Sequence, residues 1–426
     1  MPRRRLSTVP HPALKKRLII MAHLVNKKYL LPFVLITSLF FMWGFARAIL
    51  DVLNKHFQEA LSISITQSSL IQATTYLGYF LMALPAGILI TRRGYRYGVV
   101  TGLLAFGIGS LMFIPGEAIM SFEVFLVALF IIGCGLVMLE TAANPYVAEL
   151  GAPETAPSRL NLAQSFNGLG CILAPVIIGG LLFSEDSAGV SLPYTVMGIS
   201  VLALAAIFSR IRLPEIKSSR ESEPGPHVSD RKPSGVMVTV RNLLHDMHFR
   251  MGLIALFCYE IAEISINSLF INYATADGWM DKATASVILS FGALGLFMVA
   301  RIAGSWIMSR IAAGKVLLFC AVMTVAGAIA VSLDLGAVSK CGLFACYAFE
   351  AIMFPTIFAI TVAGIGDSVK IASSLLMMTP IGGAVGTFLM GYIADQTSIS
   401  TAFVIPAAGY LFVFIYALYA LKSSYK

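Results

Sequence analysis

Residues 120–148 read MSFEVFLVALFIIGCGLVMLETAANPYVA, and this long apolar run decides the class of the protein. The hydrocarbon core of a bilayer is about 30 Å thick, and about 20 helical residues are enough to cross it. Comparable runs lie near 29–53, 66–90, 97–115, 160–184, 191–212, 250–273, 284–308, 314–334, 338–364, 370–394 and 399–421. The sequence therefore predicts an all-α membrane protein with twelve transmembrane helices.

The composition supports this class and excludes a soluble globular protein. Of the 426 residues, 58% are hydrophobic and 12% are charged, whereas a soluble domain is about 45–50% apolar and about 25% charged. This chain has too few polar residues to cover a water-facing surface. A bilayer accepts apolar side chains on the outside of helices, because each helix satisfies its own backbone hydrogen bonds. We therefore expect membrane lipids around the helices.

The basic residues are concentrated in the segments between the apolar runs, which explains the formal net charge of +8. If the amino terminus is cytoplasmic, 25 of the 30 Lys and Arg residues fall on the cytoplasmic side, and only Lys55, Lys282 and Lys340 fall outside. This asymmetry predicts that both termini are cytoplasmic. Because topology accounts for the charge, we expect no nucleic-acid partner.

A polar stretch, EIKSSRESEPGPHVSDRKPSG, separates the first six apolar runs from the last six. Its proline, serine and charged residues are typical of a loop. The predicted organisation is a cytoplasmic leader at 1–28, a six-helix bundle at 29–212, a cytoplasmic linker at 213–249, a second six-helix bundle at 250–421 and a cytoplasmic tail at 422–426.

The two halves also repeat in the same direction. The pattern Ala-Gly-x5-Arg at 86–93 recurs at 303–310, and the pattern Glu-x4-Pro at 140–145 recurs at 350–355. Each match occurs in corresponding spans of the two halves. Parallel six-helix repeats are typical of one large class of secondary transporters, in which the substrate site lies between the halves near the middle of the membrane.

Span one carries a polar stripe within an apolar helix. Arg47, Asp51 and Asn54 follow i, i+4, i+7 spacing, so they share one helical face. Arg47 and Asp51 can form an ion pair along the helix. Either this pair only neutralises itself, or Asp51 lines a transport path. In a rival interpretation, Arg47 holds the carboxylate of an acidic sugar.

Span four carries Glu140 in LETAANPY, far from either end of the apolar run. An ionisable side chain inside a membrane is costly and points to an ion or substrate pathway. Asn144 follows four residues later, and Pro145 opens the local backbone hydrogen-bond ladder. A proton-coupled carrier needs a carboxyl group that can take up and release a proton, and we predict this role for Glu140. The alternative is a buried, hydrogen-bonded carboxyl group with a structural role.

Two more spans place polar side chains on one face. Gln164 and Asn167 in span five are three residues apart, and their amides offer donors and acceptors that suit sugar hydroxyls. Hydrogen bonds between packed helices are the alternative role for these amides. Glu260, Glu263 and Asn267 follow i, i+3, i+7 spacing in span seven. With Glu350 and Arg301 added, the spans hold five carboxylates and two arginines, which favours proton or cation coupling over capture of an anion.

Other classes of site are not supported by the sequence. No Gly-x-x-x-x-Gly-Lys segment is present for ATP phosphates. The six cysteines form no Cys-x-x-Cys pair, so a zinc site is not indicated. A further alternative, a non-transporting sensor or an integral-membrane enzyme, is disfavoured because no nucleophile–base set or metal-ligand cluster is present. We therefore expect no metal, no cofactor and no enzymatic activity.

The stretches FFMWGFARAILDVL, LGYFLMALPAG, LETAANPYV and RLNLAQSFNGLG closely resemble the L-fucose:proton symporter branch of the major facilitator superfamily, which also holds glucose/galactose transporters. The resemblance continues through FCYEIAE, RIAGSWIMSR and FPTIFAI, so it covers nearly the whole chain. It implies the major facilitator fold, a monosaccharide substrate, protons as coupling ion, a bacterial inner membrane and a monomer.

The resemblance also implies roles for individual residues. Asp51 matches an aspartate tied to sugar recognition and coupling, and Glu140 matches the glutamate regarded as the proton carrier. Gln164 and Asn167 match amides that line the sugar cavity. Phe354 stands where the fucose-type pattern has a tyrosine. By the residue analysis, Asn144, Arg47, Glu263 and Asn267 complete the predicted substrate-binding set.

The chain departs from the family pattern at several positions. Relatives carry asparagine near the span-one aspartate, whereas Leu50 precedes Asp51 here and Arg47 is new. Glu260, Glu263 and Glu350 stand where neutral residues are expected.

The predicted function is import of a monosaccharide such as L-fucose or a related hexose by proton symport with alternating access. The alternative is a proton-antiporting exporter of a sugar or other small metabolite, which the span-five amides disfavour because an exporter of this fold is expected to have a more apolar cavity.

Overall fold

The computed structural model describes residues 30–60, 65–152, 155–182, 189, 191–210, 236–276 and 278–423, and nearly all of them are helical. The amino-terminal half contains α2 (Leu30–Ala60), α3 (Ile65–Arg93), α4 (Tyr95–Leu111), α5 (Phe113–Ala118), α6 (Phe122–Glu149), α7 (Ala156–Leu182) and α8 (Ser191–Arg210). The carboxyl-terminal half contains α9 (Val236–His245), α10 (Met247–Ala276), α11 (Lys282–Val287), the π-helical turn η4 (Ile288–Leu294), α12 (Gly295–Met308), α13 (Ala313–Ser332), α14 (Ala337–Glu350), α15 (Met353–Val362), the 3₁₀ turn η5 (Gly366–Ser368), α16 (Val369–Leu376), α17 (Ile381–Gln396), the 3₁₀ turn η6 (Thr401–Phe403) and α18 (Val404–Ser423). The predicted all-α class is confirmed.

The number of membrane-crossing segments agrees with the sequence prediction. Within the described ranges, 11 helical segments are long and apolar enough to cross a membrane. Helix α7 is not one of these, but it is 27 residues long and packs along α2 and α12. With α7 included, the segments reach the predicted twelve.

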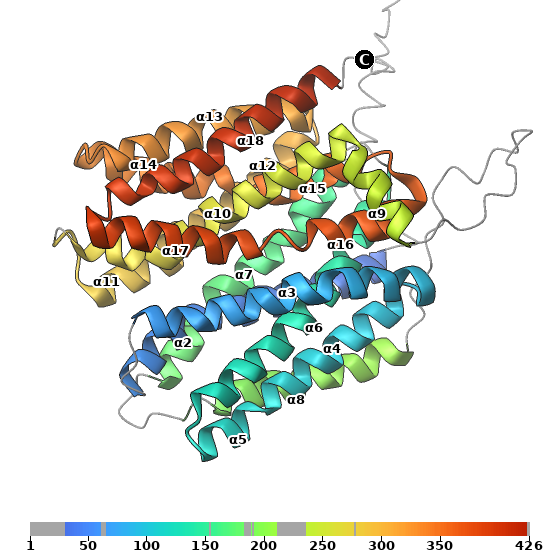
Figure 1. Cartoon of the computed structure of the whole chain (residues 1–426), viewed down its shortest axis with the longest axis horizontal. Helices are drawn as coiled ribbons and strands as arrows, with labels where there is room; N and C mark the ends of the chain where they lie inside the picture. Colours follow the sequence, from blue (N-terminus) through green and yellow to red (C-terminus); the bar gives the residue numbers. More distant parts are fainter. Residues whose placement is uncertain are drawn as a thin grey trace, which may run out of the picture.

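The helices form two bundles that face each other. In the first bundle, α2 packs on α7 and α6 packs between α3 and α4, while α8 covers α4. In the second, α10 packs on α17 and α18, and α13 packs on α14 and α18. Figure 1 shows α2 to α8 in blue to green below and α9 to α18 in yellow to red above. The bundles meet where α7 contacts α12 and α15 and where α3 contacts α16 and α17.

Glycines allow α2 and α7 to pack closely, and this contact fixes the position of the two helices relative to each other. A Cβ atom on Gly44 would collide with the carbonyl oxygen of Asn167, and one on Gly170 would collide with the carbonyl oxygen of Phe41. Small residues at such contacts are how membrane helices pack, because lipid supplies no hydrophobic driving force between them. The contact fixes α2 beside the part of α7 that carries Asn167.

Spans eight, ten and eleven of the second half are interrupted, and the break in span eleven lies at residues 377–380 between α16 and α17. Span eight contains the π-helical turn η4, a feature that is frequent at functional sites. Span ten breaks at Ala351 and Ile352, between α14 and α15. Pro355 has no N–H to donate to the Ala351 carbonyl four residues earlier. Arg301 Nε donates to that carbonyl oxygen instead, at 2.7 Å.

Two connections differ in detail from the sequence expectation. Arg159, counted as a basic residue of a cytoplasmic loop, is fully buried and donates to the carbonyl oxygens of Val147 and Ala148 at the end of α6. A buried arginine there satisfies carbonyls that the helix end leaves free. The interval 213–249, expected as a loop, contains helix α9 and the start of α10 in its described part.

Candidate functional site

A central cavity lies between the two bundles and is partly open to solvent. Both halves contribute polar side chains to its wall. The lining polar and charged residues are Arg47, Gln72, Thr75, Tyr76, Tyr79, Glu140, Gln164, Asn167, Tyr259, Glu260, Glu263, Asn267, Ser268 and Arg301. The cavity therefore lies at the interface that the parallel repeat predicted.

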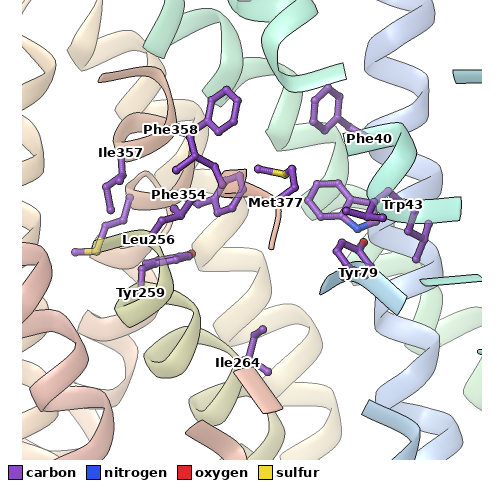
Figure 2. Close-up of a cluster of buried hydrophobic side chains, with 14 of the residues drawn as sticks. Phe40, Trp43, Tyr79, Leu256, Tyr259, Ile264, Phe354, Ile357, Phe358 and Met377 are labelled. Carbon is purple, nitrogen blue, oxygen red and sulfur yellow. The ribbon is translucent and has the colours of Figure 1, made fainter. Parts of the chain in front are cut away.

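Aromatic side chains form two opposite parts of this wall. Figure 2 shows Trp43 and Tyr79 on one side and Tyr259 and Phe354 on the other, with Met377 between the two groups in this view. The rings of Tyr259 and Phe354 are tilted by 53° with centroids 6.3 Å apart. Aromatic side chains with a polar tip offer both an apolar face and a hydrogen-bonding group. Such walls suit a sugar ring, which has apolar C–H faces and a polar rim.

Glu140 is the most deeply buried carboxyl group of the cavity wall. Only 2% of the residue is exposed, and neither carboxylate oxygen accepts a hydrogen bond from any group that the structure describes. Asn167 Nδ2 and Trp43 Nε1 are likewise buried without a described partner. Buried polar atoms are normally hydrogen-bonded. The unpaired polar atoms around this cavity are therefore candidates for hydrogen bonds to a ligand, and the carboxyl group is also a candidate for uptake and release of a proton.

The three predicted amides of the amino-terminal half have different positions. Gln164 lines the cavity and donates from Nε2 to Asn144 Oδ1 at 3.2 Å. Asn144 is fully buried, is not among the lining residues, and donates from Nδ2 to Met377 Sδ at 3.5 Å. Asn167 lines the cavity with its Nδ2 unpaired. Asn144 therefore supports Gln164 from behind, while Asn167 faces the cavity directly.

Arg47 forms an ion pair between the two halves. Its Nη2 donates to Glu263 Oε2 at 2.7 Å, and Asn267 Nδ2 donates to Glu263 Oε1 at 2.9 Å. Both carboxylate oxygens of Glu263 are thus engaged. The side chain of Asp51 lies outside the described residues, so the predicted pairing of Arg47 with Asp51 stays a prediction. The structure adds a partner that the spacing within span one does not indicate.

Arg301, the second arginine of the cavity, is directed to backbone groups. Besides the Ala351 carbonyl, it donates from Nη1 to the Gln164 carbonyl oxygen at 3.2 Å, and it lies over the ring of Phe297. Arg301 therefore joins the second half to α7. Glu350 is fully buried outside the lining set and accepts a hydrogen bond from Tyr410 Oη.

The two halves are joined at one end of the cavity by a second set of contacts. Ser158 Oγ donates to the Ser305 carbonyl oxygen and Ser305 Oγ donates to the Ser158 carbonyl oxygen, each at 2.8 Å. Asn161 Nδ2 reaches Thr356 Oγ1 at 3.4 Å. Asn161 and Ser158 lie three and six residues before the lining residue Gln164 on α7, and Ser305 lies four residues after the lining residue Arg301 on α12. The bundles are therefore closed at the end where α7 begins and α12 ends.

Several lining residues were absent from the predicted set. Span two contributes Gln72, Thr75, Tyr76 and Tyr79, and span one adds Trp43. Their spacing carried a signal, because residues 72, 75, 76 and 79 follow the i, i+3, i+4, i+7 pattern of one helical face. Trp43 lies four residues before Arg47 on the same face. Phe354, which was predicted from the resemblance, is part of the wall.

The chain is similar to known transporters over nearly its whole length. The family model described as Major Facilitator Superfamily matches residues 36–375. The L-fucose-proton symporter of Escherichia coli (strain K12) is 34% identical over 418 residues, covering 92% of this chain and 93% of that protein. The glucose/galactose transporter of Brucella abortus biovar 1 (strain 9-941) is 34% identical over 409 residues, covering 93% and 96%.

A solved structure gives the same result for the fold. The crystal structure of FucP, a major facilitator transporter in the outward conformation, superposes with a TM-score of 0.80 at 34% sequence identity. The match covers 92% of this chain and 99% of FucP. All these relatives are named as transporters, in agreement with the expectation that the chain is not an enzyme.

Proposed function

The chain belongs to the major facilitator superfamily, and from this premise we propose that it is a proton-coupled symporter that imports a monosaccharide by alternating access. The observation that carries the proposal is the cavity between the bundles, where Glu140 shares one wall with Gln164 and Asn167. A buried carboxyl group can exchange a proton, and neighbouring amides can bind sugar hydroxyls. One cavity thus holds both parts of a symport site.

The proposed roles follow the geometry of the wall. Glu140 carries the coupled proton, and Asp51 acts with it. Asn167 binds a sugar hydroxyl through its free amide, and Gln164 does so while held by Asn144. Phe354 and Trp43 contact the apolar faces of the sugar ring. Arg47, Glu263 and Asn267 form the part of the cavity wall that joins the two halves and complete the proposed substrate-binding set.

The direction of transport is part of the proposal. If both termini are cytoplasmic, the Ser158–Ser305 contacts close the cytoplasmic end of the cavity. This arrangement corresponds to loading from outside, and inward opening then requires these contacts to break. The cycle is an exchange of contacts between two bundles around one site.

The proposed cellular setting is the inner membrane of a bacterium, with the chain acting as a monomer. The proposed organisation is a six-helix bundle on each side of a cytoplasmic linker at 213–249, with a cytoplasmic leader at 1–28 and tail at 422–426. The relatives supporting this setting come from bacteria.

Uptake of radiolabelled L-fucose, D-glucose and D-galactose into cells that produce the protein tests the proposal. Accumulation that collapses on addition of a protonophore is the expected result. Accumulation that persists with a protonophore would exclude proton coupling. Efflux that increases with an inward proton gradient would instead support the exporter.

A further inference from the structure

Glu260 is a second buried carboxyl group of the cavity, contributed by the carboxyl-terminal half. It lies on α10, one turn before Glu263, so it sits about 4.5 Å further along the helix axis toward its amino-terminal end. It lines the cavity with 4% of the residue exposed. No group in the described part of the chain donates a hydrogen bond to it. This carboxylate thus faces the cavity without a bound partner.

The two arginines of the cavity are already engaged. Arg47 is bound to Glu263, whose second oxygen accepts from Asn267. Arg301 donates to the carbonyl oxygens of Ala351 and Gln164 and lies over Phe297. Neither guanidinium group forms a hydrogen bond with Glu260. A ligand carboxylate would therefore have to displace one of these interactions, whereas a ligand cation would find Glu260 free.

The charges of the cavity wall also favour a cationic ligand. Among the described lining residues, three are acidic (Glu140, Glu260, Glu263) and two are basic. A buried carboxylate without a partner costs free energy that a paired cation restores. Neutral hydroxyl groups can hydrogen-bond to a carboxylate, but they bring no positive charge to it. A protonated amine supplies both the hydrogen bonds and the charge.

We propose that Glu260 binds the ammonium group of an amino sugar, so that the preferred substrate class is a monosaccharide with a free amine. The inference rests on the proposed sugar transport through the same cavity. The amides of Gln164 and Asn167 then bind the remaining hydroxyl groups, and the aromatic wall packs against the ring. Glu263 is not available for the amine, because both of its oxygens are occupied.

Ligand binding to the purified full-length protein, measured by isothermal titration calorimetry, tests this assignment. The probes are D-glucose and its 2-amino-2-deoxy, 3-amino-3-deoxy and 6-amino-6-deoxy derivatives, the corresponding D-galactose series, and the N-acetylated forms. At least one amine should bind about tenfold or more tightly than its parent sugar, since a hydrogen bond to a charged group contributes about 1.5–3 kcal/mol. N-acetylation, which removes the positive charge, should abolish this advantage.

Variants of Glu260 identify the residue responsible. Glu260→Gln retains the shape without the charge and should make the amine and its parent sugar bind alike. Glu260→Asp retains the charge on a shorter side chain and should reduce the advantage of the amine without abolishing it. Glu123→Gln is the matched control, because Glu123 is exposed at the start of α6 and outside the cavity wall. It should leave the amine advantage unchanged.

Three outcomes would overturn the assignment: no amine binds more tightly than its parent sugar, the advantage persists in Glu260→Gln, or it is unchanged in Glu260→Asp. The last comparison decides the case if Glu260→Gln does not fold. Proton-driven uptake of neutral hexoses without an amine preference would refute this inference and leave the proposed function intact. Selective, Glu260-dependent amine binding without proton-driven uptake would support this inference and refute the proposed proton symport.

Discussion

Arg47 Nη2 lies 2.7 Å from Glu263 Oε2, and this ion pair joins residues 216 positions apart in opposite halves of the molecule. The side chain of Glu263 is 8% exposed and that of Arg47 is 26% exposed. Both residues line the central cavity. Any motion that separates the bundles at this level must break the pair, so it stabilises the arrangement observed here.

The ion pair predicts coupled effects of substitutions on stability. Removing one partner leaves the charge of the other buried and unpaired. Arg47→Ala should therefore lower the free energy of unfolding by about 3 kcal/mol. This value is at the lower limit for a buried pair because Arg47 is partly exposed. The double variant Arg47→Ala with Glu263→Gln should be more stable than Arg47→Ala alone. A thermal-shift assay in detergent measures the four proteins of the cycle.

The earlier pairing hypothesis is tested with the same assay. If Asp51 is the main partner of Arg47, then Asp51→Asn should rescue Arg47→Ala better than Glu263→Gln does. Equal or greater rescue by Asp51→Asn would contradict the dominance of the Arg47–Glu263 pair. Competition by acidic sugars alone, with no inhibition by neutral ones, would instead assign Arg47 to a ligand carboxylate.

Glu140→Gln should abolish proton-driven accumulation and leave ligand binding and exchange measurable. The amide preserves the shape of the side chain but cannot release a proton. Counterflow in proteoliposomes measures exchange, and uptake with an imposed proton gradient measures accumulation. Full accumulation by a well-folded Glu140→Gln protein would rule out Glu140 as the proton carrier.

Asn167→Ala and Gln164→Ala should behave differently although both residues line the cavity. Asn167 Nδ2 has no described partner, so Asn167→Ala should weaken sugar binding by about 0.5–1.5 kcal/mol with little change in stability. Gln164→Ala also leaves Asn144 Oδ1 without its donor, so it should lower both affinity and melting temperature. Calorimetry and thermal unfolding of the two variants check this. Unchanged affinity in both would mean that these amides serve helix packing.

The closed end of the cavity predicts a cross-link that stops transport. Ser158 Oγ and Ser305 Oγ are 3.1 Å apart, so cysteines at these two positions would place their thiol groups near each other. The double variant Ser158→Cys with Ser305→Cys should lose uptake under oxidising conditions and regain it with a reductant. The variants that carry only one of the two substitutions, with the six native cysteines retained, are the controls and should be insensitive to the oxidant. Unimpaired uptake with the cross-link formed would show that these bundle ends need not separate.

The sequence by itself determined the helical class, the number of spans and the stripes of polar residues within each span. These properties are local: the length of an apolar run sets whether it can cross a bilayer, and helical periodicity sets which side chains share a face. Glu140, Gln164 and Asn167 could be selected on this basis. Residues 72, 75, 76 and 79 could have been selected in the same way, because their spacing also places them on one helical face.

Only the tertiary structure decided which of these side chains meet. Helical spacing predicts Asp51 as a partner of Arg47, and the arrangement of the two bundles also brings Glu263 within hydrogen-bonding distance of Arg47. It also placed Asn144 behind Gln164 and left Asn167 Nδ2 without a described partner, although all three side chains are amides. Helix packing likewise brought Arg301 to the Ala351 carbonyl oxygen at the break in span ten. Contacts between helices depend on the angle and depth at which whole surfaces pack, and the spacing of residues along one helix does not contain that information.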